Sequence, residues 1–364
     1  MMPIIHELKQ TFEVRVCVTA QHREMLDQVL NLFNIVPDYD LDIMRPDQDL
    51  FDVTSEVLIG MKEIINDSKP DILLVHGDTT TSVASAIAAF YLKIHIGHIE
   101  AGLRTFDIQS PFPEEMNRQL TSRIATFHFA PTEQASKNLI AENISKDKIF
   151  VTGNTVIDAM FVALKRARLT KFSSYLLKRL NFLSQNDKEF PKIILVTGHR
   201  RENFGKGFEE ICSAIKIIAR NNPEVQIVYP VHLNPNVRRP VMRILSGQKN
   251  VHIIEPLEYL QFIKLMDVCY LILTDSGGIQ EEAPSIGKPV LLMRDNTERP
   301  EAVDAGTVRL VGSNKENIIE VTNILLNEDL EYKKMSKATN PYGDGNASQK
   351  ICEALKANKI LTTY

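Results

Sequence analysis

The stretch LTDSGGIQEEAPSIGKPVLL, residues 273–292, decides the fold. An apolar run typical of a buried strand ends at Ser276, Gly277 and Gly278, and a helical pattern follows. The two glycines allow close approach of a ligand to the backbone, and the N-terminus of the helix offers free N–H groups and a positive dipole end. The stretch therefore predicts an α/β unit with a phosphate-binding turn, to which Ser276 adds a hydroxyl donor.

Glu282 lies one to two turns into this predicted helix. Its carboxylate is placed to accept hydrogen bonds from ribose hydroxyls. The alternative is a glycine turn capped by Asp275 or Ser276, with Glu282 in solvent, because junctions of this kind are common.

Strand-like runs recur on both sides of this stretch, each followed by an amphipathic pattern. That order is typical of repeated βαβ units and of a parallel sheet covered by helices. In the second half of the chain the runs are 192–198, 225–230, 250–256, 269–278, 288–293 and 306–312. In the first half they are 13–19, 71–77, 93–99, 125–131 and 148–153.

The pattern pauses over a polar stretch, which we interpret as a crossover between two doubly wound α/β domains. We expect an N-terminal domain at 1–165, the crossover at 166–190, a C-terminal domain at 191–340 and a final helix at about 346–364 that packs back on the first domain. Ligands of such sheets bind at the carboxyl ends of the strands, so the site is expected in a central cleft.

Two carboxylates follow neighbouring strands of the first domain. Asp78 comes after the run 71–77, and Glu100 comes after the run 93–99, with Arg104 close behind it. Either carboxylate is a candidate acid/base group, although Asp78 directly before a helix is also typical of an N-cap.

Glu114 and Arg118 are spaced i, i+4 and so share one face of a predicted helix. They are a candidate carboxylate and its partner. A surface ion pair is the simpler alternative.

Cations follow the first strand of the second domain. His199, Arg200 and Arg201 stand at its carboxyl end, and His232 ends the next strand. Together with Arg299 they suit a diphosphate, whereas a lone histidine would more often be a packed core residue.

Composition excludes several classes of function. Lys+Arg 42 against Asp+Glu 46 gives a net charge of −4, which argues against nucleic acid as the main partner. No apolar run reaches the length of a membrane span, and the N-terminus lacks a secretion signal, so we expect a soluble cytoplasmic protein. The cysteines lack CxxC spacing, and the acids Asp38, Asp40 and Asp42 have no His or Cys beside them, so no metal is expected.

Seven segments together carry a family resemblance. The chain resembles the non-hydrolysing UDP-N-acetylglucosamine 2-epimerases along its whole length. The segments are VHGDTTT, HIEAGLRT, PFPEEMNR, GHRREN, LTDSGGIQEEAPS, RDNTERPEA and NPYGDG. The resemblance implies the glycosyltransferase-B fold, with two Rossmann-like domains facing a central cleft. It also implies a homodimer that interconverts UDP-N-acetylglucosamine and UDP-N-acetylmannosamine for surface polysaccharides, without NAD or metal.

The resemblance also implies a mechanism, in which UDP is eliminated to a 2-acetamidoglucal and added back. Asp78, Glu100 and Glu114 would be the acid/base groups, with Arg118 orienting Glu114. The residues expected to hold UDP are His199 at the diphosphate, Ser276, Gly277 and Gly278 at the phosphates, Glu282 at the ribose, Arg299, and Phe262 at the uracil.

The chain departs from the family at its N-terminus and at a second nucleotide-sugar site. Members usually begin with a strand ending in G-T-R-P-E, so we expect the first sheet to lack that strand. A site for activation by substrate would use Gln21, His22, Arg201 and His232 and share Glu114. Glu24 and Glu56 stand where the family is expected to have Gln and Arg, and these two acids would repel a diphosphate. Two alternatives stay open: a hydrolysing epimerase that releases N-acetylmannosamine, and a nucleotide-sugar-binding protein without turnover.

Overall fold

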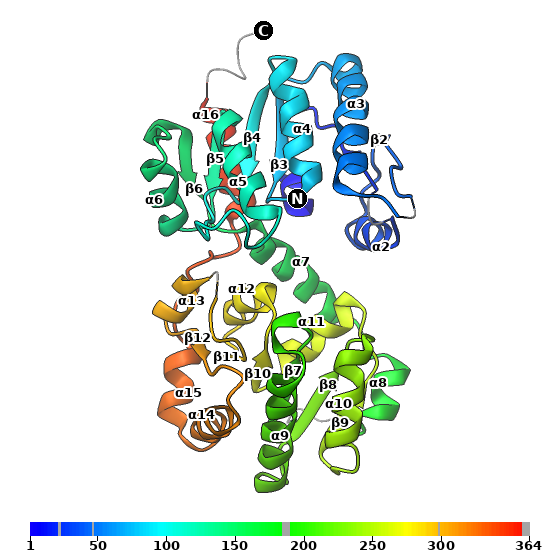
Figure 1. Ribbon diagram of the computed structural model, residues 1–364, viewed down its shortest axis with the longest axis vertical. Coiled ribbons are helices and arrows are strands. Elements are labelled where there is room, and N and C mark those ends of the chain that lie inside the picture. Colours follow the sequence, from blue (N-terminus) through cyan, green and yellow to red (C-terminus); the bar gives the residue numbers. More distant parts are fainter. Residues whose placement is uncertain (21–22, 46, 184–189, 298, 359–364) are drawn as a thin grey trace. The chain divides into compact units, whose positions relative to one another are not determined.

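The chain folds as two compact units, which the computed structural model describes over residues 1–20, 23–45, 47–183, 190–297 and 299–358 (Figure 1). Unit 1 comprises Met1–Ala159 and Tyr342–Tyr364, and unit 2 comprises Met160–Pro341. Parallel sheets with helices in both units confirm the predicted α/β class. The domain limits given above remain predictions, and residues 184–189 of the crossover and 359–364 of the final helix lie outside the described residues.

Unit 1 contains a four-stranded parallel sheet of order β3-β4-β5-β6 and a two-stranded parallel sheet of β1 and β2. Within the described residues, β3 pairs with β4 and β1 with β2, and no strand pair joins the two sheets. The strands are β1 (Cys17–Val18), β2 (Tyr39–Asp40), β3 (Ile72–His76), β4 (His95–Ile99), β5 (Phe127–Ala130) and β6 (Ile149–Val151).

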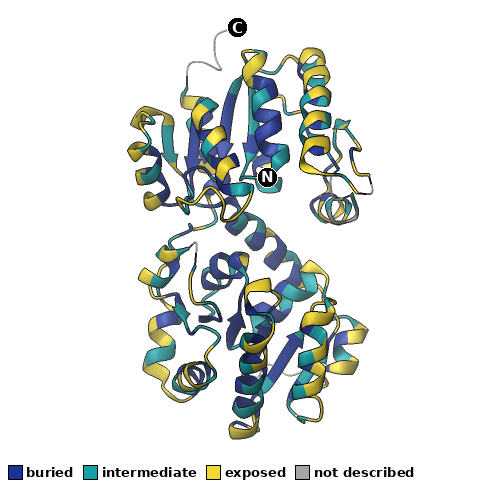
Figure 2. Ribbon diagram, in the orientation of Figure 1, coloured by how far each residue is buried: buried dark blue, intermediate teal, exposed yellow. Residues whose placement is uncertain are grey.

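The helices of unit 1 bury their apolar faces against these strands, while their outer faces stay exposed (Figure 2). Helix α3 begins at a capping box formed by Asp49 and Asp52. The helices are α1 (Met2–Leu8), α2 (Arg23–Phe33), α3 (Leu50–Ser68), α4 (Thr80–Tyr91), α5 (Glu114–Ile124), α6 (Glu133–Ala141) and α16 (Ala347–Ala357), with a 3₁₀ turn at Lys146–Lys148. Helix α7 (Thr155–Leu169) runs from unit 1 into unit 2.

Helix α16 is fixed to unit 1 at its N-terminus and along its apolar face. The buried carboxylate of Asp158 in α7 accepts hydrogen bonds from the backbone N–H groups of Ala347 (3.2 Å) and Ser348 (2.8 Å). It thereby satisfies two of the free donors at this helix end. The apolar face of α16 packs into a cluster that includes Ile4, Leu8, Phe127, Phe129, Ile351 and Leu355.

Unit 2 contains a six-stranded parallel sheet of order β12-β11-β10-β7-β8-β9. This is the strand order of the Rossmann fold, in which the direction of winding reverses between β7 and β10. The strands are β7 (Ile193–Thr197), β8 (Gln226–Pro230), β9 (Val251–Ile254), β10 (Leu271–Thr274), β11 (Val290–Leu292) and β12 (Val308–Leu310). Its remaining helices are α8 (Ser174–Arg179), α9 (Lys206–Asn221), α10 (Pro235–Leu245), α11 (Tyr259–Val268), α12 (Gly277–Ser285), α13 (Pro300–Asp304), α14 (Lys315–Asn327) and α15 (Asp329–Ser336), with a 3₁₀ turn at Arg201–Asn203.

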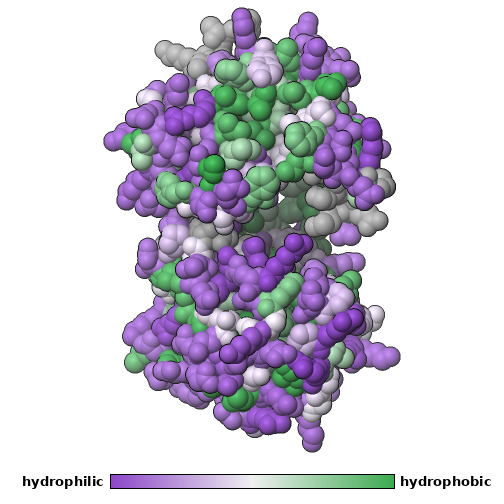
Figure 3. Space-filling model, in the orientation of Figure 1, coloured by the Kyte–Doolittle hydropathy of each residue, from purple (hydrophilic) through white to green (hydrophobic). Residues whose placement is uncertain are grey.

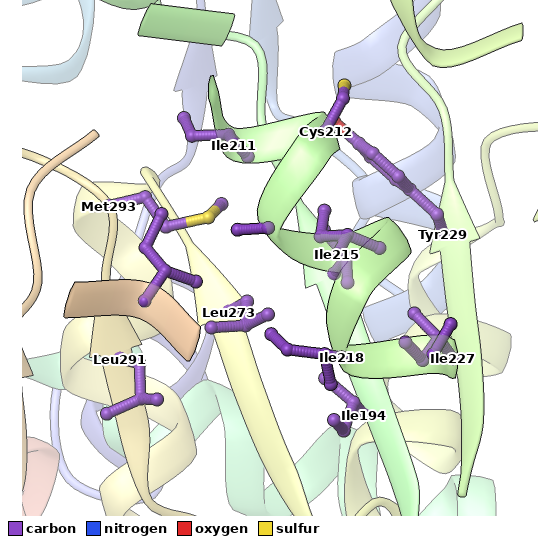
Figure 4. Close-up of a cluster of buried hydrophobic side chains, with 14 of the residues drawn as sticks. Ile194, Ile211, Cys212, Ile215, Ile218, Ile227, Tyr229, Leu273, Leu291 and Met293 are labelled. Atoms are coloured by element: carbon purple, nitrogen blue, oxygen red, sulfur yellow. The ribbon is translucent and has the colours of Figure 1, made fainter. Parts of the chain in front are cut away.

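The core of unit 2 forms where α9 covers the sheet (Figure 4). Ile211, Ile215 and Ile218 recur at helical spacing and are fully buried over Ile194 of β7 and Ile227 of β8. Packing of the apolar strand residues against this face of α9 fixes the position of β7 and of the loop that follows it. Within the described part of the chain, no helix has both the length and the apolar character needed to cross a bilayer.

Candidate active site

The turn after β3 places Asp78 at the carboxyl edge of the unit 1 sheet. Gly77 takes a φ of +68°, which glycine adopts at little cost, and α4 starts after it. The N-cap of α4 is Thr79, whose hydroxyl accepts a hydrogen bond from Ser82 N–H. The Asp78 carboxylate is therefore not the cap of this helix and remains available to interact with α5.

Asp78 is bound by Arg118 of α5. The guanidinium donates from Nε (2.9 Å) and Nη2 (2.7 Å) to Oδ2 of Asp78. Burial raises the pKa of Asp78, Arg118 opposes that rise, and the neighbouring carboxylates Glu100 and Glu114 add to it. A carboxylate with a raised pKa takes up a proton more readily than a free carboxylate does, which suits an acid/base group.

The predicted pairing of Arg118 with Glu114 is wrong. Arg118 Nη1 donates to Oε2 of Glu115 at 2.9 Å, three residues away on the same helix. Glu115 is fully buried, and it also accepts hydrogen bonds from the backbone N–H groups of Thr105 (3.0 Å) and Phe106 (3.3 Å). Burial alone would raise the pKa of Glu115, but the hydrogen bonds from Thr105 N–H and the Gln119 side chain, together with Arg118, lower it. Arg118 therefore links Glu115 to Asp78 and leaves Glu114 outside this ion-pair network.

Glutamine substitutions at the two neighbouring glutamates separate their roles. We expect Glu115→Gln to lower the free energy of unfolding by about 3 kcal/mol, since it leaves Arg118 short of a buried charged partner. Glu114→Gln, at a half-buried position, should change it by less than about 0.5 kcal/mol. Urea unfolding followed by circular dichroism measures both, and an equal loss in the two variants would contradict the observed network.

Glu100 stands at the end of β4 in a left-handed backbone conformation, with φ of +63°. This conformation is strained for a residue other than glycine, and such strain is concentrated at functional sites. Its Oε2 atom lies 3.3 Å from Nε2 of His76 and accepts a hydrogen bond from Asn154 Nδ2 at 3.3 Å. Arg104, which the sequence places beside Glu100, instead has a fully buried side chain that binds Glu142 through Nε (2.6 Å) and Nη2 (2.9 Å).

The carboxyl ends of β7 and β10 meet at the switch point of the unit 2 sheet, and Asp275 ties them together. Its carboxylate is fully buried and accepts hydrogen bonds from the backbone N–H groups of His199 (2.9 Å) and Arg200 (2.9 Å). Asn203 Nδ2 adds a longer contact at 3.4 Å. Asp275 therefore holds the turn at residues 198–201 in place and does not cap α12.

His199 projects from this turn, and its ring stacks on that of His232, with the centroids 5.6 Å apart. Its Nδ1 lies 3.5 Å from Oδ1 of Asp275. Burial lowers the pKa of His199, Asp275 opposes this, and Arg200 and His232 add to the lowering. Arg201 and His232 are exposed, so the turn presents several hydrogen-bond donors to solvent at the carboxyl edge of the sheet.

The N-terminus of α12 follows β10 directly. Ser276 is its N-cap residue, but its side chain makes no capping hydrogen bond, so the capping alternative is not observed. A Cβ atom added at Gly278 would meet no heavy atom within 4 Å. The first turn of α12 is thus open, with its N–H donors and the Ser276 hydroxyl at the predicted phosphate-binding position.

Glu282 and Tyr259 form a hydrogen-bonded pair between α12 and α11. The Tyr259 hydroxyl donates to Oε1 of Glu282 at 3.0 Å. Burial raises the pKa of Glu282 to about 7, the hydrogen bond from Tyr259 lowers it, and Glu281 raises it. Phe262, the predicted uracil contact, lies half-buried on the same helix α11.

Stability of the fold should depend on pH through Glu282. Its pKa in the folded protein, about 7, lies above the ordinary value of 4.5, so the folded state holds the proton more tightly. The contribution is full below pH 4.5 and is lost as pH rises toward 7. We expect Tm to fall over this range in the wild type relative to Glu282→Gln. Tyr259→Phe should extend the fall to higher pH, and parallel Tm curves for wild type and Glu282→Gln would contradict the assignment.

Arg299, predicted to bind UDP, is held by Glu281 of α12. Its Nε donates to Oε1 of Glu281, a carboxylate that is only 3% exposed. Arg299 N–H also donates to Thr297 Oγ1 (3.0 Å), whose hydroxyl in turn donates to Gln280 of α12 (2.8 Å). The loop after β11 is thereby fastened to the helix whose N-terminus forms the phosphate-binding turn.

The sequence profile described as UDP-N-acetylglucosamine 2-epimerase matches residues 6–356 of this chain. The chain belongs to the UDP-N-acetylglucosamine 2-epimerase family. A UDP-N-acetylglucosamine 2-epimerase of Yersinia pestis is 58% identical over 363 residues, which cover 99% of this chain and 96% of the relative.

Solved structures of family members agree with the fold. The UDP-GlcNAc 2-epimerase of Neisseria meningitidis, bound to UDP-GlcNAc, is 53% identical and superposes with a TM-score of 0.88, covering 98% of this chain and 96% of the other. The UDP-GlcNAc 2-epimerase of Methanocaldococcus jannaschii, in complex with UDP-GlcNAc and UDP, is 35% identical with a TM-score of 0.79, covering 98% and 96%. These matches confirm the expected family and its glycosyltransferase-B-like fold.

Sequence patterns do not identify every residue of the candidate site. Glu115, Asn117 and Glu281 were not recognised, and Asp275 was considered only as a cap. The adjacent acids at 114–115 and 281–282 were the only available signal. Of the predicted activator site, Gln21 and His22 lie outside the described residues. Within the described residues, no cluster of three His, Cys, Asp or Glu side chains could hold a metal ion.

Proposed function

We propose that this chain reversibly converts UDP-N-acetylglucosamine to UDP-N-acetylmannosamine by inverting C2 of the sugar. The main support for the proposal is the cluster of carboxylates around Asp78. Burial and the neighbouring carboxylates Glu100 and Glu114 raise the pKa of Asp78. Inversion at a carbon requires proton removal on one face and delivery on the other. A carboxylate with a raised pKa that lies beside two further carboxylates suits this task.

Elimination and re-addition of UDP form the mechanism that we infer. One carboxylate takes the C2 proton while the C1–O bond to UDP breaks, and a C1=C2 double bond forms in the 2-acetamidoglucal. A second group then protonates C2 on the opposite face, and UDP adds back at C1. Asp78, Glu100 and Glu114 are the acid/base candidates, and Arg118 fixes the Asp78 carboxylate in one orientation.

Unit 2 is proposed to hold the departing UDP. His199 and the Ser276–Gly277–Gly278 turn would bind the diphosphate, because donors fixed before the reaction stabilise leaving-group charge without reorganisation. Glu282 would accept from the ribose hydroxyls and Phe262 would contact the uracil. Arg299 would act partly through Glu281, to which it is already bound.

Product analysis tests this function directly. Incubation with UDP-N-acetylglucosamine, followed by anion-exchange separation and proton NMR, should give UDP-N-acetylmannosamine in a fixed equilibrium ratio with no free sugar. Free N-acetylmannosamine with UDP would show a hydrolysing enzyme instead. Binding of UDP with no product would show a binding protein without turnover.

We infer a homodimer, with exposed apolar residues of unit 1 as its contact face. Phe90 and Tyr91 at the end of α4 are 53% and 71% exposed, and Met116 and Leu120 on α5 are 41% and 44% exposed. Helices α4 and α5 pack together, and Figure 3 shows apolar side chains gathered on this face of the unit. Such a patch marks an interaction site. Light scattering should give twice the chain mass, and Tyr91→Glu should shift it toward the monomer.

Two further expectations stay predictions. Activation by substrate would use Gln21, His22, Arg201 and His232, and sigmoidal kinetics in UDP-N-acetylglucosamine would support it. The cytoplasmic location expected from the sequence stays a prediction, and the use of the products for surface polysaccharides follows from the resemblance alone.

A further inference from the structure

Three successive backbone carbonyls in the turn that carries Asp78 are each bound by a side chain from a different element. Ser82 Oγ of α4 donates to His76 O at 2.7 Å. His98 Nε2 of β4 donates to Gly77 O at 2.8 Å, and Asn117 Nδ2 of α5 donates to Asp78 O at 2.9 Å. The turn is therefore held along its length, immediately before the carboxylate that Arg118 binds.

His98 is the unexpected member of this set, because it lies in the middle of the sheet. It is fully buried between Gly97 and Ile99 on β4. A carbonyl oxygen only accepts, so the bond to Gly77 O requires a proton on Nε2, which the neutral Nε2–H tautomer and the charged ring both carry. Burial lowers the pKa of His98 to about 3, so throughout the neutral range the ring is the neutral Nε2–H tautomer. Its Nδ1 has no hydrogen-bond partner among the described residues.

A buried imidazole with an unpartnered nitrogen is costly, and an apolar side chain would fill this strand position at lower cost. A role in holding the backbone at Gly77 would compensate for this cost. Gly77 has a φ of +68°, and a Cβ there would meet nothing within 4 Å, so neighbouring atoms do not confine it sterically. A glycine hinge of this kind needs hydrogen bonds to hold one conformation. The backbone N–H of Gly77 donates to Ile99 O at 2.9 Å, and His98 supplies the bond to its carbonyl oxygen, on the side of the residue that leads to Asp78.

We propose that His98 is a positioning residue for epimerisation, which sets the direction of the Asp78 carboxylate by holding Gly77 O. This inference rests on the proposed function, because it assumes that Asp78 acts in proton transfer. The required placement of acid/base groups is strict, and a shift of about 1 Å can cost about 100-fold in rate.

His128 provides a matched control on the neighbouring strand. It lies opposite His98 in the register of β4 and β5, and it too is fully buried. Burial lowers its pKa to about 4. Neither of its ring nitrogens has a hydrogen-bond partner among the described residues. Replacing His128 therefore removes a buried imidazole without removing a bond to the turn.

The test compares His98→Leu, His98→Gln and His128→Leu in the full chain. Leucine removes the donor at similar volume, whereas the glutamine amide can place an N–H donor near the position of Nε2. We expect His98→Leu to lower kcat by about 10- to 100-fold with KM changed less than about 3-fold. His98→Gln should recover most of the loss, and His128→Leu should stay within about 3-fold of the wild type. A kcat for His98→Leu equal to that of His128→Leu, or no recovery with glutamine, would overturn the proposal.

Two further measurements keep this proposal separate from the function on which it rests. Nitrogen NMR of histidine-labelled wild type should show His98 as the neutral Nε2–H tautomer between pH 6 and 8, whatever the activity. A charged ring or an Nδ1–H tautomer would overturn the proposal even in an active epimerase. If the wild type makes no epimer, the proposed function fails while the tautomer measurement stands. If His98→Leu does not fold, His98→Met takes its place against His98→Gln.

Discussion

Replacing Asp78 by asparagine should lower kcat for epimerisation by about 10²- to 10⁴-fold, the usual contribution of one general acid/base group. The substitution keeps the size of the side chain, and its amide oxygen can still accept from Arg118 Nε. It removes the group whose pKa burial and neighbouring carboxylates raise. The affinity for UDP, proposed to lie with unit 2, should change less than about 3-fold. Initial rates and UDP titration by calorimetry measure the two quantities.

The control for Asp78→Asn is Asp107→Asn, in the loop before α5. Asp107 is exposed, and among the described residues its side chain receives a local hydrogen bond from Gln109 N–H. Its substitution should leave kcat near the wild-type value. An Asp78→Asn variant with more than a tenth of the wild-type kcat would show that Asp78 does not carry proton transfer, and the carboxylate role would pass to Glu100 or Glu114.

Replacing Asp275 by asparagine should destabilise unit 2 by about 3 kcal/mol and weaken UDP binding. The buried carboxylate accepts from the N–H groups of His199 and Arg200. The asparagine NH₂ would face one of these donors and leave it unsatisfied, which costs about 1–3 kcal/mol, and loss of the charge adds to this. Urea unfolding gives the stability change, and calorimetry gives the affinity.

Asp267→Asn in the same unit is the matched control for Asp275→Asn. Asp267 also binds two donors, Nε and Nη2 of Arg168 at 2.8 and 2.7 Å, but Arg168 is 61% exposed. Surface pairs of this kind contribute less than about 1 kcal/mol. If both variants lose the same stability, the burial of Asp275 does not set the geometry of the switch point.

Local patterns predicted the fold because each strand of the two main sheets carries its own signal. The apolar runs, the glycine turn after β10 and the helical pattern after it lie within a few residues of one another. Parallel strands then bring Asp78 and Glu100 to one edge of unit 1, and His199 and Ser276 to one edge of unit 2. Strand β1 was predicted over seven residues but covers only Cys17–Val18, since pairing with β2 limits its length.

Contacts between residues that are far apart in the sequence determine which side chains pair in the candidate site. Glu114 and Glu115 are equally acidic neighbours, and the i, i+4 spacing favours Glu114 as the partner of Arg118. Glu115 is the partner because the Thr105–Phe106 backbone covers it and donates to it. Likewise, Asp275 and Asp78 both stand shortly before a helix, where N-cap residues are common. The carboxylate of Asp275 instead binds the His199 turn, and that of Asp78 binds Arg118. No local pattern contains such partners.

Proton NMR of UDP-N-acetylglucosamine incubated in D₂O with the wild type and with Asp78→Asn tests whether the chain inverts C2 and whether Asp78 transfers the proton. The expected result is that the wild type forms the manno epimer with deuterium at C2 and no free sugar, and that Asp78→Asn loses both C2 exchange and epimer formation while it still binds UDP. Epimer that retains the C2 proton, or undiminished C2 exchange in Asp78→Asn, would contradict it.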